Sequence, residues 1–180
     1  STPLYSSAAS DVYKRQEQYK AQREETPEAI RLSVPIIKDV IRAYRIPILE
    51  VAGYEADDVI GTLATEAGRQ GITTYMMTPD KDYGQLVSDR VFMYRPKHTG
   101  GFEVMGTEEV KTKFNIQTTE QVIDMLGLMG DASDNIPGCP GVGEKTAQKL
   151  IAEFGCIENL LEHTDQLKGA LKTKVETNRE

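Results

Sequence analysis

The sequence has no long apolar run, few cysteines and no excess of positive charge, and these absences exclude several classes of protein. No apolar run approaches the roughly 20 residues that a membrane-spanning helix needs, and no basic stretch followed by an apolar one marks a signal peptide. The two cysteines, Cys139 and Cys156, are too few for a disulfide framework and are not spaced as zinc ligands. We therefore expect a globular protein of the reducing cytoplasm that has no contact with membranes.

The net charge of −7 and the pI of about 5.0 leave one class of partner open. Proteins that bind nucleic acids usually carry a basic patch, so an acidic chain argues against such a partner. A pocket of carboxylates that holds metal ions, however, adds negative charge that the ions neutralise in the working protein. The motifs must therefore decide whether the chain binds nucleic acid.

Hydrophobic periodicity predicts an α/β lobe in the first part of the chain. Residues 1–16 show no period, and we interpret them as a segment outside the fold. The patterns that follow predict a helix that begins after Thr26, is broken or kinked at Pro35 and ends near Tyr44. They then predict a strand over residues 46–51, a helix over 55–70, and strands over 72–78, 91–94 and 102–105. A strand, a helix and a strand in succession favour a right-handed parallel crossover.

From residue 107 onward the pattern is that of helices. Thr107 is the predicted cap of the first helix, and Thr118 with Gln121 predicts a capping box for the next. Four apolar residues of that second helix are expected to point inward: Val122, Ile123, Leu126 and Met129. A helix over residues 144–154 should end at Gly155. The sequence thus predicts a sheet-based lobe over residues 17–105 and a helical lobe over residues 106–180.

Seven carboxylates stand in three short motifs. They are Glu55, Asp57 and Asp58 in Gly-Tyr-Glu-Ala-Asp-Asp, Asp80 and Asp82 in Thr-Pro-Asp-Lys-Asp, and Asp131 and Asp134 in Gly-Asp-Ala-Ser-Asp-Asn. Each motif alone has an ordinary structural explanation. The first would be acids that stabilise the start of a helix, the second a polar turn that caps a helix, and the third an Asx turn.

Taken together, the three motifs indicate a divalent metal site. Carboxylate oxygens without a nearby histidine or cysteine select hard cations such as Mg²⁺ or Mn²⁺. Seven acids gathered in one pocket would repel one another strongly unless cations neutralised them. A pair of ions roughly 4 Å apart stabilises both the attacking and the leaving oxygen when a phosphodiester is hydrolysed. The carboxylates therefore favour a nuclease that uses two metal ions.

A glycine-containing turn before the helix over residues 144–154 indicates a grip on DNA. Gly141 and Gly143 would let backbone amides approach a phosphate at the helix N-terminus, beside the lysines of the first turns, Lys145 and Lys149. The run Pro-Gly-Val-Gly-Glu-Lys-Thr-Ala is typical of a helix–hairpin–helix. The alternative is an ordinary tight turn before an amphipathic helix. The apolar side chains around it are expected to be core: Val142, Leu150, Ile151 and Phe154.

In their order and spacing, these motifs resemble the 5′ nuclease domains of bacterial DNA polymerases I, in the flap-endonuclease superfamily. The similarity extends over residues 17–180 and includes Tyr-Lys-x-x-Arg, followed by Thr-Pro-Glu. It implies a PIN-like parallel-sheet lobe, then a helical lobe with a helix–hairpin–helix. It also implies roles for three groups of residues. The seven carboxylates would be metal ligands. The base of a helical arch would bind DNA through Tyr19, Lys20 and Arg23, and Lys20 and Arg23 would stabilise charge at the scissile phosphate. The glycine turn would bind duplex DNA and hold a K⁺ ion, through Gly141, Val142, Gly143, Lys145 and Thr146.

The resemblance implies a 5′→3′ exonuclease and flap endonuclease that uses two Mg²⁺ or Mn²⁺ ions. Its substrates would be 5′ flaps, nicked duplexes and RNA primers, in replication and repair, and the domain would be a monomer with polymerase domains in the same chain. The family also has a strand that ends in a metal-binding Asp, and a further ligand Asp before the arch. Neither is found before Tyr19, so we expect a sheet lobe that is incomplete at its N-terminus. The alternative is a DNA-binding fragment without catalysis.

Overall fold

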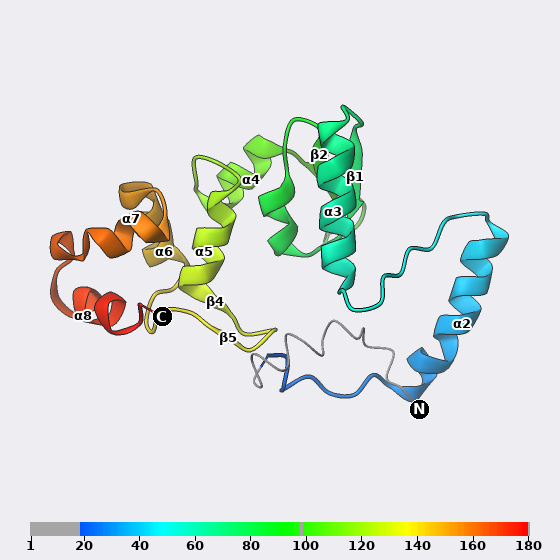
Figure 1. The fold of residues 1–180 in the computed structure, drawn as a ribbon, viewed down its shortest axis with the longest axis horizontal. Helices are drawn as coiled ribbons and strands as arrows, with labels where there is room; N and C mark the ends of the chain where they lie inside the picture. The colour runs from blue at the N-terminus through cyan, green and yellow to red at the C-terminus, as the bar shows by residue number, and fades with distance from the viewer. Residues whose placement is uncertain (1–18, 98, 180) are drawn as a thin grey trace. The chain divides into compact units, whose positions relative to one another are not determined.

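The fold is taken from a computed structural model that describes residues 19–97 and 99–179 (Figure 1). Contacts divide the chain into two compact units, residues 1–60 and 61–180, and the division falls within helix α3 (Ala56–Arg69). The predicted N-terminal segment, residues 1–16, lies outside the described residues. Among the helices that the structure describes, none combines the length and apolar character that a membrane span requires.

The first unit contains helix α2 (Glu28–Ala43), which begins after Pro27 and ends next to Tyr44. The predicted break at Pro35 does not occur, because the helix continues through Pro35 to Ala43. Proline removes one amide donor, and the apolar stripe on both sides of it still favours a helix. The predicted strand over residues 46–51 is also wrong: these residues form no strand. A strand requires a partner for its backbone groups, and the described part of this unit offers none.

The second unit contains a sheet of three strands in the order β1 (Thr74–Met77), β2 (Val91–Pro96), β3 (Phe102–Met105). Strand β1 pairs with β2 in parallel, Thr74 opposite Val91, and β2 pairs with β3 antiparallel. All three strands were predicted. The parallel pair differs from the predicted one, which joined a strand over residues 46–51 to the strand over 72–78. In the structure, the parallel strands are β1 and β2, and their connection passes through the 3₁₀ helix η1 (Lys81–Leu86).

One core lies where the sheet meets the first helices of the second unit. Met76 and Met93 from the strands pack there with Val110 of helix α4 (Thr107–Phe114) and with Val122 of helix α5 (Gln121–Met129). The predicted boundary between residues 105 and 106 therefore cuts through one packed core. The predicted cap of helix α4, Thr107, is instead its first residue: Gly106 holds the cap position, one residue earlier, and its amide donates to Glu109.

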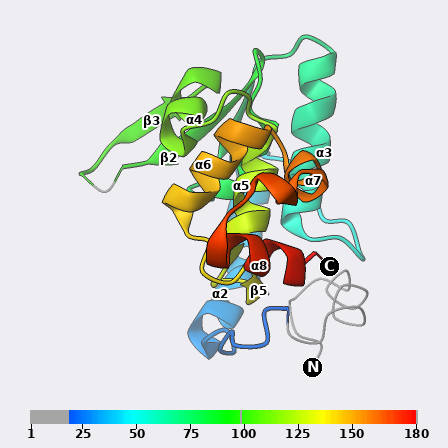
Figure 2. The same ribbon diagram turned by 90° about the vertical axis from the view of Figure 1, so that its left-hand side faces the viewer.

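A second core fills the helical part of the same unit. Its helices are α5, α6 (Glu144–Phe154), α7 (Ile157–Glu162) and α8 (Gly169–Thr177), with the 3₁₀ helix η2 (Thr164–Gln166) between the last two. Helix α6 lies beside α5 in both views (Figures 1 and 2). Helix α5 places Met125 and Leu128 in this core, whereas Ile123 is 56% exposed, so its predicted inward position is wrong. Ile116 packs against both cores.

Candidate metal and nucleic-acid site

The second carboxylate motif follows the carboxyl end of strand β1. Asp80 caps helix η1, because its Oδ1 accepts a hydrogen bond from the amide of Asp82 at 3.0 Å. The amide of Asp80 in turn donates to Thr78 Oγ1 at 3.1 Å. The polar turn that was the ordinary explanation of this motif is therefore formed. One accepted hydrogen bond uses only part of what a carboxylate offers, since its two oxygens have about four lone-pair sites.

The third motif is joined to the second by an ion pair. Lys81 Nζ lies 2.8 Å from Asp131 Oδ2, and Asp131 Oδ1 accepts the amide of Ser133 at 2.7 Å, which forms the alternative Asx turn. The hydrogen bond from Lys81 lowers the pKa of Asp131 despite partial burial. The same hydrogen bond raises the pKa of Lys81. Lys81 was not among the predicted site residues, and only the fold shows that it bridges two motifs.

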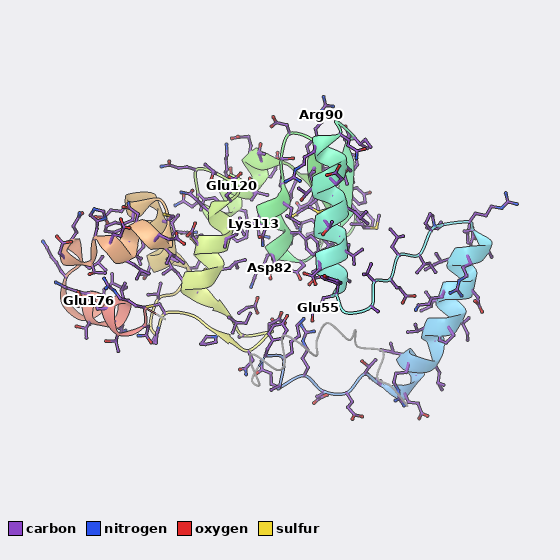
Figure 3. All side chains as sticks on the ribbon, viewed as in Figure 1. Glu55, Asp82, Arg90, Lys113, Glu120 and Glu176 are labelled. Carbon is purple, nitrogen blue, oxygen red and sulfur yellow. The ribbon has the colours of Figure 1, made fainter. Side chains whose placement is uncertain are left out.

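Asp82 is the carboxylate whose environment most favours an added cation. Its Oδ1 is buried and accepts no hydrogen bond from the described residues; Figure 3 labels Asp82 on the ribbon. Burial raises the pKa of Asp82, and so do the negative charges of Asp80, Asp131 and Asp134, while Lys81 opposes them. Four acids of two predicted motifs thus lie within electrostatic reach of one another. A group in this setting is stabilised by a positive ion that it can contact directly.

The acids are close enough to influence one another but are not drawn together into a coordination shell. Nowhere in residues 19–97 and 99–179 do three or more acid, histidine or cysteine side chains approach closely enough to hold a metal ion. The donor chemistry nevertheless fits Mg²⁺ or Mn²⁺, because the cluster offers carboxylate oxygens alone. The predicted set of seven ligands remains a prediction.

The first motif belongs to the other unit, where it opens helix α3. Asp58 Oδ2 accepts a hydrogen bond from the amide of Glu55 at 2.9 Å, so the Asp58 side chain satisfies a backbone donor at the N-terminus of its own helix. Asp57 and Asp58 are both exposed. These positions agree with the ordinary explanation for acids in a first turn.

Glu55 is held by two residues that were predicted to contact DNA. Lys20 Nζ lies 2.9 Å from Glu55 Oε2, and Tyr19 Oη donates to the same oxygen at 3.3 Å. The side chains of Lys20 and Glu55 are only 10% and 24% exposed. Burial lowers the pKa of Lys20, but its hydrogen bonds to Tyr19 and Glu55 outweigh burial and raise it. The third predicted cation, Arg23, is exposed, and its amide donates to the carbonyl of Lys20.

A tight hairpin joins helices α5 and α6. Its two short strands, β4 (Gly130–Asp131) and β5 (Ile136–Pro137), pair antiparallel, so that the chain reverses directly after α5 (Figure 1). Gly138 lies against the end of α5, and a Cβ there would be 2.5 Å from the carbonyl oxygen of Met129. The hairpin thus approaches the helix so closely that no side chain fits between them.

The hairpin ends in the predicted glycine turn. Gly141 is exposed with φ +77°, and Gly143 is exposed at the cap of α6. Between them Val142 is 5% exposed, because its side chain enters the second core, as predicted. Lys145 is exposed and Thr146 half-buried on the first turn of α6. The turn therefore exposes glycine backbone beside Lys145, while the buried side chain of Val142 anchors it in the second core.

Comparison with known proteins agrees with this fold. Residues 10–115 match the model of the 5′-3′ exonuclease N-terminal resolvase-like domain, and residues 117–180 match that of the 5′-3′ exonuclease C-terminal SAM fold. The first match begins at residue 10, earlier than the predicted start at residue 17. The change from one model to the next falls about ten residues after the predicted boundary.

Known relatives and solved structures extend the same likeness. The chain is 43% identical to DNA polymerase I of Bacillus caldotenax over 91% of its own length and 19% of that protein. It is 39% identical to a 5′-3′ exonuclease of Aquifex aeolicus, covering 83% of this chain and 50% of that protein. Among solved structures, the T5 D15 protein co-crystallised with metal ions has a TM-score of 0.75 at 25% identity, covering 93% of this chain and 66% of the other. The chain thus spans half or less of the length of these two relatives, and it belongs to the 5′-3′ exonuclease family.

Proposed function

We propose that this chain is part of a metal-dependent nuclease that hydrolyses phosphodiester bonds in 5′→3′ direction, at DNA flaps and nicks and in RNA primers. The observation that carries the proposal is the environment of Asp82. A buried carboxylate oxygen without a donor, among three further acids, is unfavourable unless a cation completes it. Membership in the 5′-3′ exonuclease family supports a role for this acidic cluster in phosphodiester hydrolysis.

The residues proposed to hold two Mg²⁺ or Mn²⁺ ions are the seven acids of the three motifs. Such ions supply a hydroxide nucleophile at neutral pH and stabilise the leaving oxygen. Lys81 holds the Asp131 carboxylate in place through its 2.8 Å ion pair. Lys20 and Arg23 are proposed to stabilise negative charge on the phosphate that is cut. For Lys20 this requires a change of partner, since its ammonium group is engaged by Glu55.

The glycine turn is proposed to bind the duplex part of the substrate. Exposed glycine backbone at Gly141 and Gly143 admits a phosphate group, and Lys145 adds a positive charge beside it. A K⁺ ion at this hairpin belongs to the same proposal. So do a monomeric state, a cytoplasmic location and polymerase domains elsewhere in the whole protein. The support for duplex binding at this turn is the family match together with the hairpin geometry.

The competing candidate is a DNA-binding fragment that does not cut. It is favoured by the distances among the acids, because the described residues bring no three of them within reach of one ion. The two candidates share the hairpin and differ in the carboxylates. Substitutions in the acidic cluster therefore separate them, whereas substitutions in the hairpin do not.

The test uses a labelled 5′-flap DNA with and without Mg²⁺. We expect cleavage only with Mg²⁺ by the unmodified chain, and binding without cleavage by Asp82→Asn and Asp80→Ala. Asp89→Asn, an exposed acid outside the three motifs, should cut like the unmodified chain and serves as the matched control. Full activity of Asp80→Ala would refute the assignment of the site. Binding without cleavage by the unmodified chain would establish the competing candidate for this chain.

A further inference from the structure

Helix α8 brings a lysine onto the glycine turn. A Cβ built on Gly141 would lie 3.3 Å from Lys174 Cε and would overlap with Lys174 Nζ. The lysine side chain therefore lies directly over the bare α carbon of Gly141, at the turn that precedes helix α6. Gly141 is thus required for two reasons: its positive φ disfavours a side chain, and a side chain would displace Lys174.

The ammonium group of Lys174 has no partner among the described residues. Throughout the part of the chain that the structure describes, no carboxylate pairs with it and no oxygen accepts a hydrogen bond from it. Lys174 is exposed, so water solvates its charge. Its positive charge also acts on Cys139 in the hairpin: burial raises the pKa of the Cys139 thiol, and the charge of Lys174 opposes that rise. Its neighbour Lys172 differs, because its Nζ lies 3.9 Å from Glu176.

We propose that Lys174 is a further DNA-binding residue, which contacts a backbone phosphate at the glycine turn. The inference rests on the proposed function, since it assigns a second cation to the duplex-binding surface formed by Gly141, Gly143 and Lys145. An unpaired ammonium beside exposed backbone amides is suited to phosphate, because lysine binds it as a compact charge with three donors. Helix α8, which follows the hairpin after α6, α7 and η2, thereby becomes part of the DNA-binding surface.

The contribution of Lys174 should appear in the salt dependence of binding. A contact with one phosphate adds about 0.9 to the slope of log affinity against log salt for duplex DNA, which amounts to roughly eightfold in affinity at 0.1 M salt. The contact is with the DNA backbone, so the loss should be the same for different sequences. Neither effect requires catalysis or a divalent ion.

The experiment measures binding of a labelled duplex by fluorescence anisotropy, in EDTA, from about 50 to 200 mM salt, the range in which phosphate contacts dominate. Lys174→Met should bind roughly eightfold more weakly at 0.1 M salt and lose about 0.9 of the slope. Lys174→Arg should keep the slope. Lys172→Met, two residues away on the same helix, is the matched control and should bind like the unmodified chain.

The outcomes separate this inference from the function on which it rests. If the unmodified chain does not bind duplex DNA, the proposed function fails. If it binds and Lys174→Met keeps its slope, or Lys172→Met loses as much, the inference fails. Thermal unfolding of each variant identifies a purely structural role. If Lys174→Met unfolds at a lower temperature, and Lys174→Arg restores that temperature without restoring the slope, Lys174 supports the hairpin and does not bind phosphate.

Discussion

Replacement of Gly138 by alanine tests how closely the hairpin approaches helix α5. A Cβ at this position would lie 2.5 Å from the carbonyl oxygen of Met129 and would overlap with the backbone of Gly130. These neighbours are backbone atoms, so no side chain can rotate away to make room. We expect Gly138→Ala to force the hairpin away from the helix and to destabilise the helical part of the second unit.

The size of the effect follows from this crowding. Inserting a methyl group into a packed site costs typically about 1–3 kcal/mol, and the rigid neighbours of Gly138 place the cost near the upper end. For a chain of this length, about 3 kcal/mol corresponds to a fall in melting temperature of roughly 6–12 °C. Gly143→Ala is the matched control, because a Cβ there would meet nothing within 4 Å. Its only cost is that of alanine at a helix cap, about 0.5 kcal/mol.

The measurement is thermal unfolding followed by circular dichroism, for the unmodified chain and both variants. Gly138→Ala should melt well below Gly143→Ala. If the two variants melt together with the unmodified chain, the hairpin does not pack against α5 as described. If both melt at the same reduced temperature, glycine flexibility rather than close approach determines stability, and the steric argument fails.

Two further predictions concern helix packing in the second unit. Burial raises the pKa of Asp124, although its carboxylate accepts the amide of Ile157 at 2.9 Å. Because this pKa is higher in the folded than in the unfolded state, the contribution of Asp124 to folding stability is complete at low pH and is lost as the pH rises through the folded-state pKa. Asp124→Asn, which keeps an acceptor without the charge, should therefore be more stable than the unmodified chain in urea at pH 7 but not below the ordinary aspartate pKa of about 3.9, and an equal gain at both pH values would contradict this. Ile151→Ala, at a residue 1% exposed, should cost about 2–5 kcal/mol in the same assay. Ile123→Ala, at a residue of α5 that is 56% exposed, should change stability by no more than about 0.5 kcal/mol, and a loss as large as that expected for Ile151→Ala would refute the observed orientation of α5.

The elements predicted well are those with strong local signals. Helix α6 runs from Glu144 to Phe154, as predicted, because Gly143 and Gly155 mark its ends and its apolar residues recur at helical spacing. The failures come from tertiary context. Residues 46–51 are apolar like a strand, but a strand also needs a neighbour, which no local pattern reveals. Ile123 is as apolar as Val122, and only the packing partners of α5 decide which of them is buried.

The candidate site shows the same division between local and distant information. The three carboxylate motifs were found because each is a short run of sequence, and the local turns proposed as their alternatives are formed as well. Local turns and metal binding are compatible, because an oxygen that accepts an amide leaves lone pairs for an ion. Lys81 and Lys174 were missed. Each contacts a residue far away in the sequence, which spacing alone cannot indicate.

Helix α5 has a consequence for how the second unit unfolds. It contributes Val122 to one core and Met125 to the other, and Ile116, just before it, packs against both. The two regions that match separate family models therefore share one structural element. Loss of either core would remove support from the other, so we infer that both melt in a single cooperative transition. A chain cut near Ile116 would leave two fragments that each expose part of a core, and neither fragment would be an independently folding domain.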